Sequence, residues 1–330
     1  MMSDRERESI MKNIRQQVKL NKIALLHFII LAAVAWNFMG CGSGKKHYAI
    51  ERVTEIPDYQ HAAQKSDEAS KKNLPEMTAD EFEMLGDSLL GRKNLHLAYL
   101  QYERSLKLNP DNLRVEYKMG VTLLIGKNED EAISQFKKIL EKDGGFARAY
   151  EGIGRAYFQK KEYRDAERNF IKAVAIDQKL WMSHNYIGTI YDYQKNYAEA
   201  VKEYKTAIAL KPNRGLIYNN LGVSYSLAGQ QQSAVRAFNK AIELKYNKIE
   251  VYNNLGLALA NSDLYQEALA AFKKAGSEAQ AYNNLGCIYL HQGKYREAIH
   301  CFEKAINLEP AFYAKASENL KKAKAFSTRQ

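Results

Sequence analysis

The sequence predicts an all-α fold, a solenoid built from repeated pairs of helices. Three features of the 330 residues support this prediction. Glycines recur at a spacing of 34 residues, an alanine follows each of them twelve residues later, and an aromatic residue comes four residues after that alanine. A fixed period of this size is the sequence signature of stacked helical repeats.

The repeat is visible in seven successive units. The glycines are Gly86, Gly120, Gly154, Gly188, Gly222, Gly256 and Gly286. The alanines are Ala98, Ala132, Ala166, Ala200, Ala234, Ala268 and Ala298, and the aromatics are Tyr102, Phe136, Phe170, Tyr204, Phe238, Phe272 and Phe302. Glycine and alanine let two antiparallel helices approach closely, and the aromatic rings fill the space that remains between neighbouring pairs.

This pattern resembles the tetratricopeptide repeat (TPR), whose two helices per unit carry the same glycine, alanine and aromatic spacing. The resemblance covers residues 78–312 in about seven repeats and implies a right-handed superhelical solenoid. A capping helix and tail are expected at residues 313–330. A solenoid grows by addition of units and needs no single core, whereas a generic helical bundle would lack a repeat of this period.

The first element in chain order is an export signal at residues 1–40. A basic region ends at Lys22, and the residues of Ile23–Trp36 are apolar except for His27. These fourteen residues are short for a membrane span, which needs about 20, but they suit the apolar part of a signal peptide.

The end of this segment, Gly40-Cys41, resembles a bacterial lipobox. In that family the cysteine is acylated and a signal peptidase cuts before it, so lipidation of Cys41 is expected. Phe38 and Met39 depart from the usual pattern, and an uncleaved single-span anchor is the alternative. Gly42 follows the cysteine where an inner-membrane lipoprotein often has aspartate. The resemblance therefore favours an outer membrane lipoprotein that faces the periplasm.

A polar tether is expected at residues 41–77, because small and charged residues dominate and no apolar period persists. A flexible chain of this length has an end-to-end distance of about 35 Å. Thr78 and Glu81 then have the spacing of a capping box, which predicts that the first helix starts after Thr78.

The repeats are expected to start at Ala79, Leu113, Ala147, Trp181, Gly215, Ile249 and Ala279. The last start comes four residues early, so one helical turn is missing after Ala275, with Gly276 as the expected C-cap. The missing turn is either a tolerated deletion or a change in the binding surface.

The resemblance also implies a binding groove. In TPR proteins the first helix of each unit lines the concave face, which binds segments of other proteins. The second, fifth and ninth residues of that helix usually face the ligand. An amide both donates and accepts, so a row of asparagines could hold a peptide backbone, or it could bond to the neighbouring helix instead. These asparagines are Asn185, Asn219, Asn220, Asn253, Asn254, Asn283 and Asn284.

The earlier part of this surface is charged and aromatic. Its residues are Arg114, Tyr117, Arg148, Glu151, Arg155 and Phe158. This set does not reproduce the Lys/Asn carboxylate clamp of chaperone-binding TPR domains.

The net charge of +11 could suggest nucleic acid, but lysine and arginine alternate with acidic residues along the helices, which predicts solvated faces. The seven histidines have no metal-ligand spacing, and no phosphate loop, nucleophile elbow or zinc motif occurs. Cys287 and Cys301 are expected to be unpaired thiols. We therefore expect a chain that is not an enzyme and has no metal, cofactor, small-molecule substrate or nucleic-acid partner.

Among exported proteins of this kind, the chain most resembles the TPR lipoproteins of Tad/Flp-type pilus assembly, the TadD group. The resemblance implies a membrane-anchored scaffold that binds pilus, secretin or other envelope assembly components. One alternative is an adaptor for murein hydrolases or proteases at the outer membrane. Another is a cytoplasmic assembly factor with an N-terminal membrane anchor.

Overall fold

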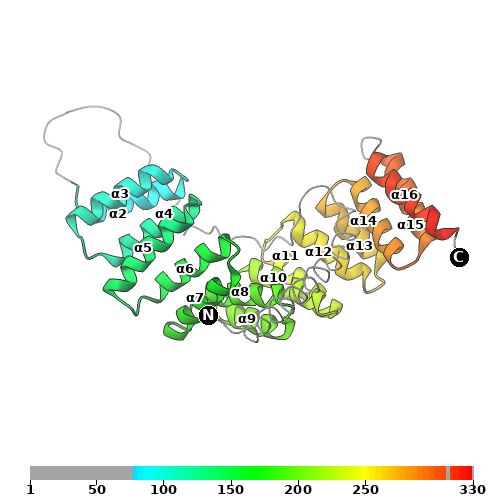
Figure 1. Ribbon diagram of the computed structural model, residues 1–330. Coiled ribbons are helices and arrows are strands. Elements are labelled where there is room, and N and C mark those ends of the chain that lie inside the picture. The colour runs from blue at the N-terminus through cyan, green and yellow to red at the C-terminus, as the bar shows by residue number, and fades with distance from the viewer. Residues whose placement is uncertain (1–76, 310–312, 329–330) are drawn as a thin grey trace, which may run out of the picture. The chain divides into compact units, whose positions relative to one another are not determined.

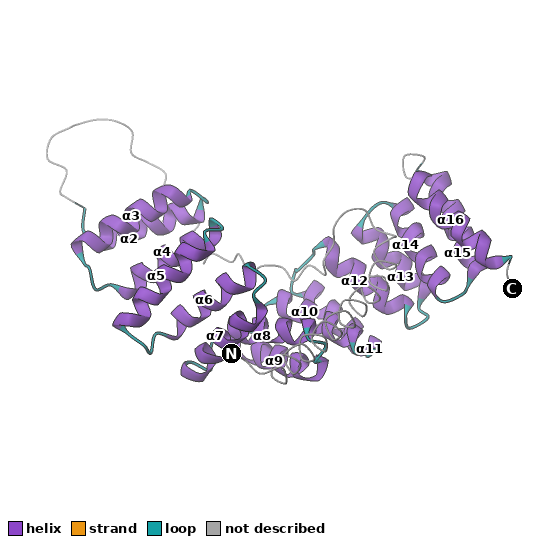
Figure 2. Cartoon of the chain, in the orientation of Figure 1, coloured by secondary structure: helices purple, strands orange, loops and turns teal. Residues whose placement is uncertain are grey.

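The computed structural model describes residues 77–309 and 313–328. Within those residues it contains fifteen helices, α2 to α16, joined by turns and loops with no strand (Figure 2). The predicted signal segment, Cys41 and almost all of the predicted tether lie outside the described residues. No helix in the described part of the chain is both long enough and apolar enough to cross a membrane.

The helices form the predicted pairs, and we call the first helix of each repeat A and the second B. The A helices are α2 (Ala79–Gly91), α4 (Leu113–Ile125), α6 (Ala147–Gln159), α8 (Trp181–Tyr193), α10 (Gly215–Leu227), α12 (Ile249–Ala260) and α14 (Glu278–His291). The B helices are α3 (Leu95–Leu108), α5 (Glu129–Lys142), α7 (Tyr163–Ile176), α9 (Tyr197–Leu210), α11 (Gln231–Glu243), α13 (Tyr265–Ala275) and α15 (Tyr295–Leu308). The final helix is α16 (Tyr313–Ser327). Six of the seven predicted repeat starts match, and α14 begins one residue before Ala279.

The described helices belong to two bodies. The first body holds α2 to α11, and the second holds α12 to α16. Within each body every A helix packs against the B helix of its own repeat, and that B helix packs against the next A helix. Figure 1 shows these pairs following one another in chain order. The fold is therefore all-α and repetitive, as the glycine period predicts.

The glycine and the aromatic residue that recur in every repeat contact each other inside each helix pair. A Cβ atom placed on Gly222 would lie 2.6 Å from Phe238 Cε1, which is closer than side chains can approach. The same contact joins Gly154 to Phe170 and Gly256 to Phe272. Phe238 and Phe170 are fully buried. The glycine is needed because the aromatic ring lies against the backbone of the partner helix.

Each turn from an A helix to its B helix contains one residue in the left-handed conformation. These residues occupy the same position in every repeat, and their φ angles lie between 61° and 76°: Lys93, Lys127, Lys161, Lys195, Gly229, Asp263 and Gly293. The N–H of Lys161 donates to Phe158 O at 3.0 Å, and the N–H of Glu162 donates to Tyr157 O at 2.9 Å. These two bonds close the end of α6 in the manner of a Schellman motif.

The first helix starts where the capping box predicts. The N–H of Glu81 donates to Thr78 Oγ1 at 3.3 Å, and the N–H of Thr78 donates to Glu81 Oε2 at 2.7 Å. Two N–H groups that the helix start would otherwise leave unbonded are thereby satisfied.

The shortened sixth repeat is also confirmed, because α13 has 11 residues where α15 has 14. Gly276 is its C-cap, but with φ −171° it is extended rather than left-handed. Ser277 and Gln280 form a second capping box, which starts α14 immediately afterwards. The sequence prediction missed that box, although Ser277 and Gln280 have the spacing of Thr78 and Glu81.

Candidate protein-binding surface

A helices of neighbouring repeats contact one another, for example α4 with α6 and α8 with α10. Their fifth residues therefore form a row, which we call the A-helix surface together with the residues one turn to either side. In the first body this row is Glu83, Tyr117, Glu151, Asn185 and Asn219, and in the second body it is Asn253 and Asn283. Acidic and aromatic residues thus give way to neutral amides along the chain.

The amides of the fourth and fifth repeats bond across the interface between α8 and α10. Asn220 Nδ2 donates to Asn185 Oδ1 at 3.1 Å, and Asn219 Nδ2 donates to Asn220 Oδ1 at 3.4 Å. All three side chains are buried. Asn185 Nδ2 and Asn219 Oδ1 are buried without a hydrogen-bond partner. These asparagines connect neighbouring helices and keep one free donor and one free acceptor, so peptide binding by them stays a prediction.

The second body repeats this arrangement in part. Asn319 Nδ2 of α16 donates to Asn283 Oδ1 at 3.0 Å, and both residues are buried. Asn253, Asn254 and Asn284 are only half-buried. Of the predicted amides, these three are the most accessible.

The first two repeats carry an ion-pair cluster that the sequence prediction missed. Glu83 is buried, and its carboxylate lies 2.6 Å from both Arg114 Nη2 and Lys118 Nζ. Lys118 Nζ also lies 2.6 Å from Asp87 Oδ2. Burial raises the pKa of Glu83, but hydrogen bonds from Lys118 and Arg114 outweigh it and hold that pKa below its usual value. Glu83 is the fifth residue of its repeat, and that register could have identified it.

The third repeat brings together several of the predicted residues. Glu151 is buried and accepts a hydrogen bond of 2.7 Å from Ser183 Oγ of α8. Tyr117 is half-buried, with its ring 5.6 Å from the ring of Phe136. Arg148 is exposed, whereas Arg155, two turns further along α6, is buried.

Aromatic side chains continue this surface towards the turns between A and B helices. The Phe158 ring lies 5.0 Å from the Tyr186 ring, and the Tyr163 ring stacks on the Tyr193 ring at 4.8 Å. Tyr193 is 45% exposed. A partner that lies along the A helices would therefore meet both polar groups and an aromatic edge.

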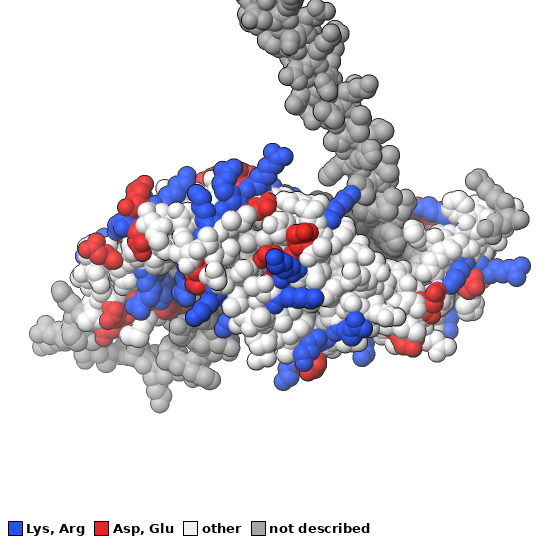
Figure 3. Space-filling view, turned by 90° about the horizontal axis from the view of Figure 1, so that it is seen from below, with Lys and Arg blue, Asp and Glu red and all other residues white. Residues whose placement is uncertain are grey.

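Charged side chains elsewhere are interspersed. On the face drawn in Figure 3, lysine and arginine stand beside aspartate and glutamate rather than forming a field of one sign. Lys160, for example, lies 2.7 Å from Asp130 Oδ1. His184 Nδ1 lies 2.6 Å from Glu203 Oε2, which joins α8 to α9. No group of three or more potential metal ligands occurs among the described residues.

The two cysteines of the seventh repeat are not paired with each other. Cys301 is a free thiol and is buried, as expected. Cys287 is not a free thiol, so the prediction is wrong for that residue. Asn319 Nδ2 lies 3.5 Å from Cys287 Sγ.

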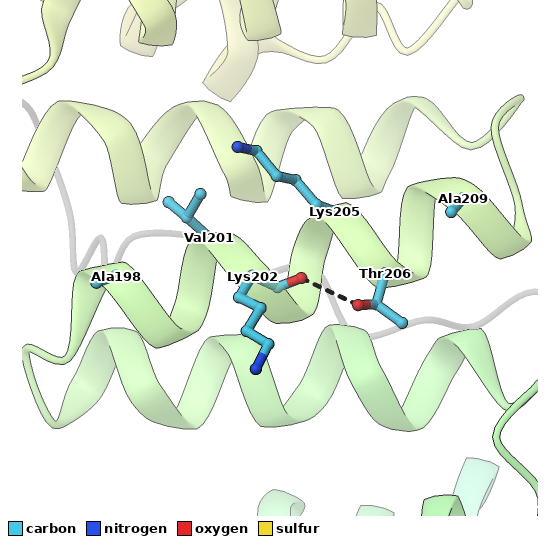
Figure 4. A pocket seen from close by; sticks show the side chains of 6 residues that line it. All are labelled: Ala198, Val201, Lys202, Lys205, Thr206 and Ala209. Atoms are coloured by element: carbon cyan, nitrogen blue, oxygen red, sulfur yellow. Dashed lines mark hydrogen bonds between the residues drawn. The ribbon is translucent and has the colours of Figure 1, made fainter.

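A shallow hollow of about 470 Å³ lies along α9 and is lined by Ala198, Val201, Lys202, Lys205, Thr206 and Ala209. Figure 4 shows Lys202 and Lys205 pointing to opposite sides of the helix, with the Thr206 hydroxyl donating to the Lys202 carbonyl oxygen at 3.2 Å. All six residues belong to a B helix. The hollow is therefore separate from the A-helix surface.

Comparison with protein families assigns most of the repeats. Models described as tetratricopeptide repeat match residues 147–180, 180–247, 249–275 and 279–312. These residues are tetratricopeptide repeats. The matched TPR units include the asparagine row and the third repeat. Proteins with TPR units generally act as scaffolds for protein interactions rather than as catalysts.

Three solved structures illustrate what this chain is similar to. The APC/C hetero-tetramer Cut9-Hcn1 is 22% identical with a TM-score of 0.55, over 74% of this chain and 49% of that chain. The pilF protein of Pseudomonas aeruginosa is 22% identical with a TM-score of 0.50, over 64% of this chain and 96% of that chain. MamA is 27% identical with a TM-score of 0.44, over 48% of this chain and 92% of that chain. The comparison with curated proteins gives no match.

Proposed function

We propose that this chain is a membrane-anchored scaffold that binds other proteins during assembly of a bacterial envelope machine, and that the machine is a Tad/Flp-type pilus or its secretin. The repeats supply the binding surface, and the lipid expected on Cys41 supplies the location at the outer membrane. The pilus assignment rests on the resemblance of Gly40-Cys41 to a lipobox, combined with a polar tether and TPR units.

The observation that carries the binding role is the unused hydrogen-bonding capacity of the A-helix surface. Asn185 Nδ2 and Asn219 Oδ1 are a buried donor and a buried acceptor without partners. A buried polar group left unbonded costs about 1–3 kcal/mol. A partner backbone offers N–H and C=O groups, so a modest side-chain rotation would let it satisfy both atoms.

The test is a crosslinked pull-down of the full-length protein from native envelopes, followed by identification of the bound proteins. We expect secretin or pilus subunits in the wild-type sample. Charge reversal by Arg148→Glu, on the A-helix surface, should reduce their recovery severalfold. The matched control is Lys202→Glu, an exposed charge reversal on α9, which should leave recovery unchanged.

The other outcomes separate the alternatives. Recovery of murein hydrolases or proteases would favour the adaptor. An equal loss of recovery in Arg148→Glu and Lys202→Glu would show that the A-helix surface is not the binding surface. Labelling with radioactive fatty acid tests the anchor, because label should disappear in Cys41→Ser. Equal labelling of that variant and the wild type would exclude a lipoprotein.

A further inference from the structure

Arg155 is a buried cation that makes no close ion pair with the described residues, although the charge of Glu151 attracts it. The residue is 9% exposed, and no carboxylate oxygen in the described part of the chain lies within ion-pair distance of its guanidinium. Its Nε–H has no hydrogen-bond partner. Removing a charge from water without pairing it is costly, so such groups are normally bonded to an anion.

The neighbours of Arg155 satisfy only part of its hydrogen-bonding capacity. The phenol groups of Tyr117 and Tyr186 are hydrogen-bonded to the guanidinium. Glu151, one turn earlier on the same helix, directs its carboxylate to Ser183 of α8. Burial raises the pKa of Glu151, while the hydrogen bond from Ser183 and the charges of Arg155 and Arg148 oppose that rise. The Nε–H of the guanidinium is therefore a donor left over on the A-helix surface.

We propose that Arg155 binds the carboxylate of an aspartate or glutamate side chain in the partner segment that lies on the A-helix surface. The proposal rests on the proposed function, since it names the chemistry of the partner at that surface. The planar fork of a guanidinium matches the two oxygens of a carboxylate, and the exposed cation Arg148 on the same helix adds to the attraction.

A side chain fits this position better than a chain end. The row of fifth residues continues on both sides of the third repeat, through Glu83 and Tyr117 in one direction and Asn185 and Asn219 in the other. A segment that follows the whole row would have its middle at Arg155. A segment bound to Arg155 by its C-terminal carboxylate would end at the third repeat and leave half of the row uncovered.

The experiment compares three libraries of short random peptides binding to the full-length protein in detergent. The first library has glutamate fixed at the central position and an amidated C-terminus. The second has glutamine at that position and the same amide. The third has glutamine and a free C-terminal carboxylate. Binding of each library is measured for the wild type, Arg155→Met, Arg155→Lys and the control Arg164→Met, which changes an exposed arginine on α7.

We expect the wild type to prefer the glutamate library by about tenfold or more, because a charge-assisted hydrogen bond is among the stronger polar contacts. Arg155→Met should lose the preference, Arg155→Lys should keep part of it, and Arg164→Met should keep all of it.

Three results would overturn the proposal. They are equal binding of the glutamate and glutamine libraries, tightest binding of the free-carboxylate library, and a glutamate preference that survives in Arg155→Met. None of these results would contradict the scaffold proposal, because that proposal is tested by the proteins recovered from envelopes.

Discussion

Replacing Gly152 by alanine should destabilise the junction between the second and third repeats. A Cβ atom at Gly152 would lie 2.5 Å from both Cε2 and Cζ of Phe136. The ring cannot move away, because its opposite edge is held by Gly120, where an added Cβ would lie 2.5 Å from Phe136 Cε1. Phe136 is fully buried between the two glycine backbones.

The magnitude follows from two opposing contributions. Overfilling a packed core costs about 1–3 kcal/mol, and the upper end applies here because the ring is clamped on both sides. Alanine favours a helix over glycine by about 1 kcal/mol. The expected net loss for Gly152→Ala is therefore about 2 kcal/mol in the free energy of unfolding.

The assay is a urea titration of the full chain followed by far-ultraviolet circular dichroism. Gly91→Ala is the matched control, because no atom would lie within 4 Å of its added Cβ, and we expect it to be neutral or slightly stabilising. Adding Phe136→Leu to Gly152→Ala should recover part of the loss relative to Phe136→Leu alone. A Gly152→Ala protein as stable as the wild type would refute the packing argument.

Three further predictions concern buried or strained residues. Burial raises the pKa of Asp192 from 3.8 to about 6, so the folded protein holds a proton there that the unfolded chain has released. As the pH rises from about 4 to about 6, the wild type should therefore lose stability relative to Asp192→Asn, by up to about 3 kcal/mol in urea titrations. Burial also raises the pKa of the Cys301 thiol to about 11, so mass spectrometry should find it alkylated by iodoacetamide only after unfolding. Lys161→Gly should raise the free energy of unfolding by about 1 kcal/mol because its φ of 65° is strained, and Gly229→Lys should lower it similarly.

The helix pairs could be predicted from sequence because their determinants are local and periodic. Gly154 and Phe170 sit at fixed positions in their repeat, and the short backbone-to-ring contact between them needs those residue types. The capping box at Thr78 and the lost turn after Ala275 follow from the same register. The left-handed lysines were not predicted, because lysine carries no signal for a positive φ; Gly229, Asp263 and Gly293 at the same position indicate it.

The candidate site was only partly predictable, because burial and partner choice depend on neighbouring repeats. The register placed Asn185 and Asn219 on the correct helices, but it could not show that Asn220 would donate across the interface to Asn185. Arg155 was expected to face a ligand, yet its lack of a close ion pair depends on Glu151 turning to Ser183, a residue of the next repeat. Pairings of this kind arise between units, and a single-repeat pattern does not contain them.

The glycine–aromatic contact has a consequence for how this chain can change over generations. Gly86 meets Tyr102 and Gly286 meets Phe302, so each of these tight contacts lies inside one repeat. Duplication or loss of a whole 34-residue unit would leave such contacts intact, and the array could lengthen or shorten without redesign. The clamp of Phe136 between Gly120 and Gly152 crosses a boundary, so the second and third repeats should be inherited as a block.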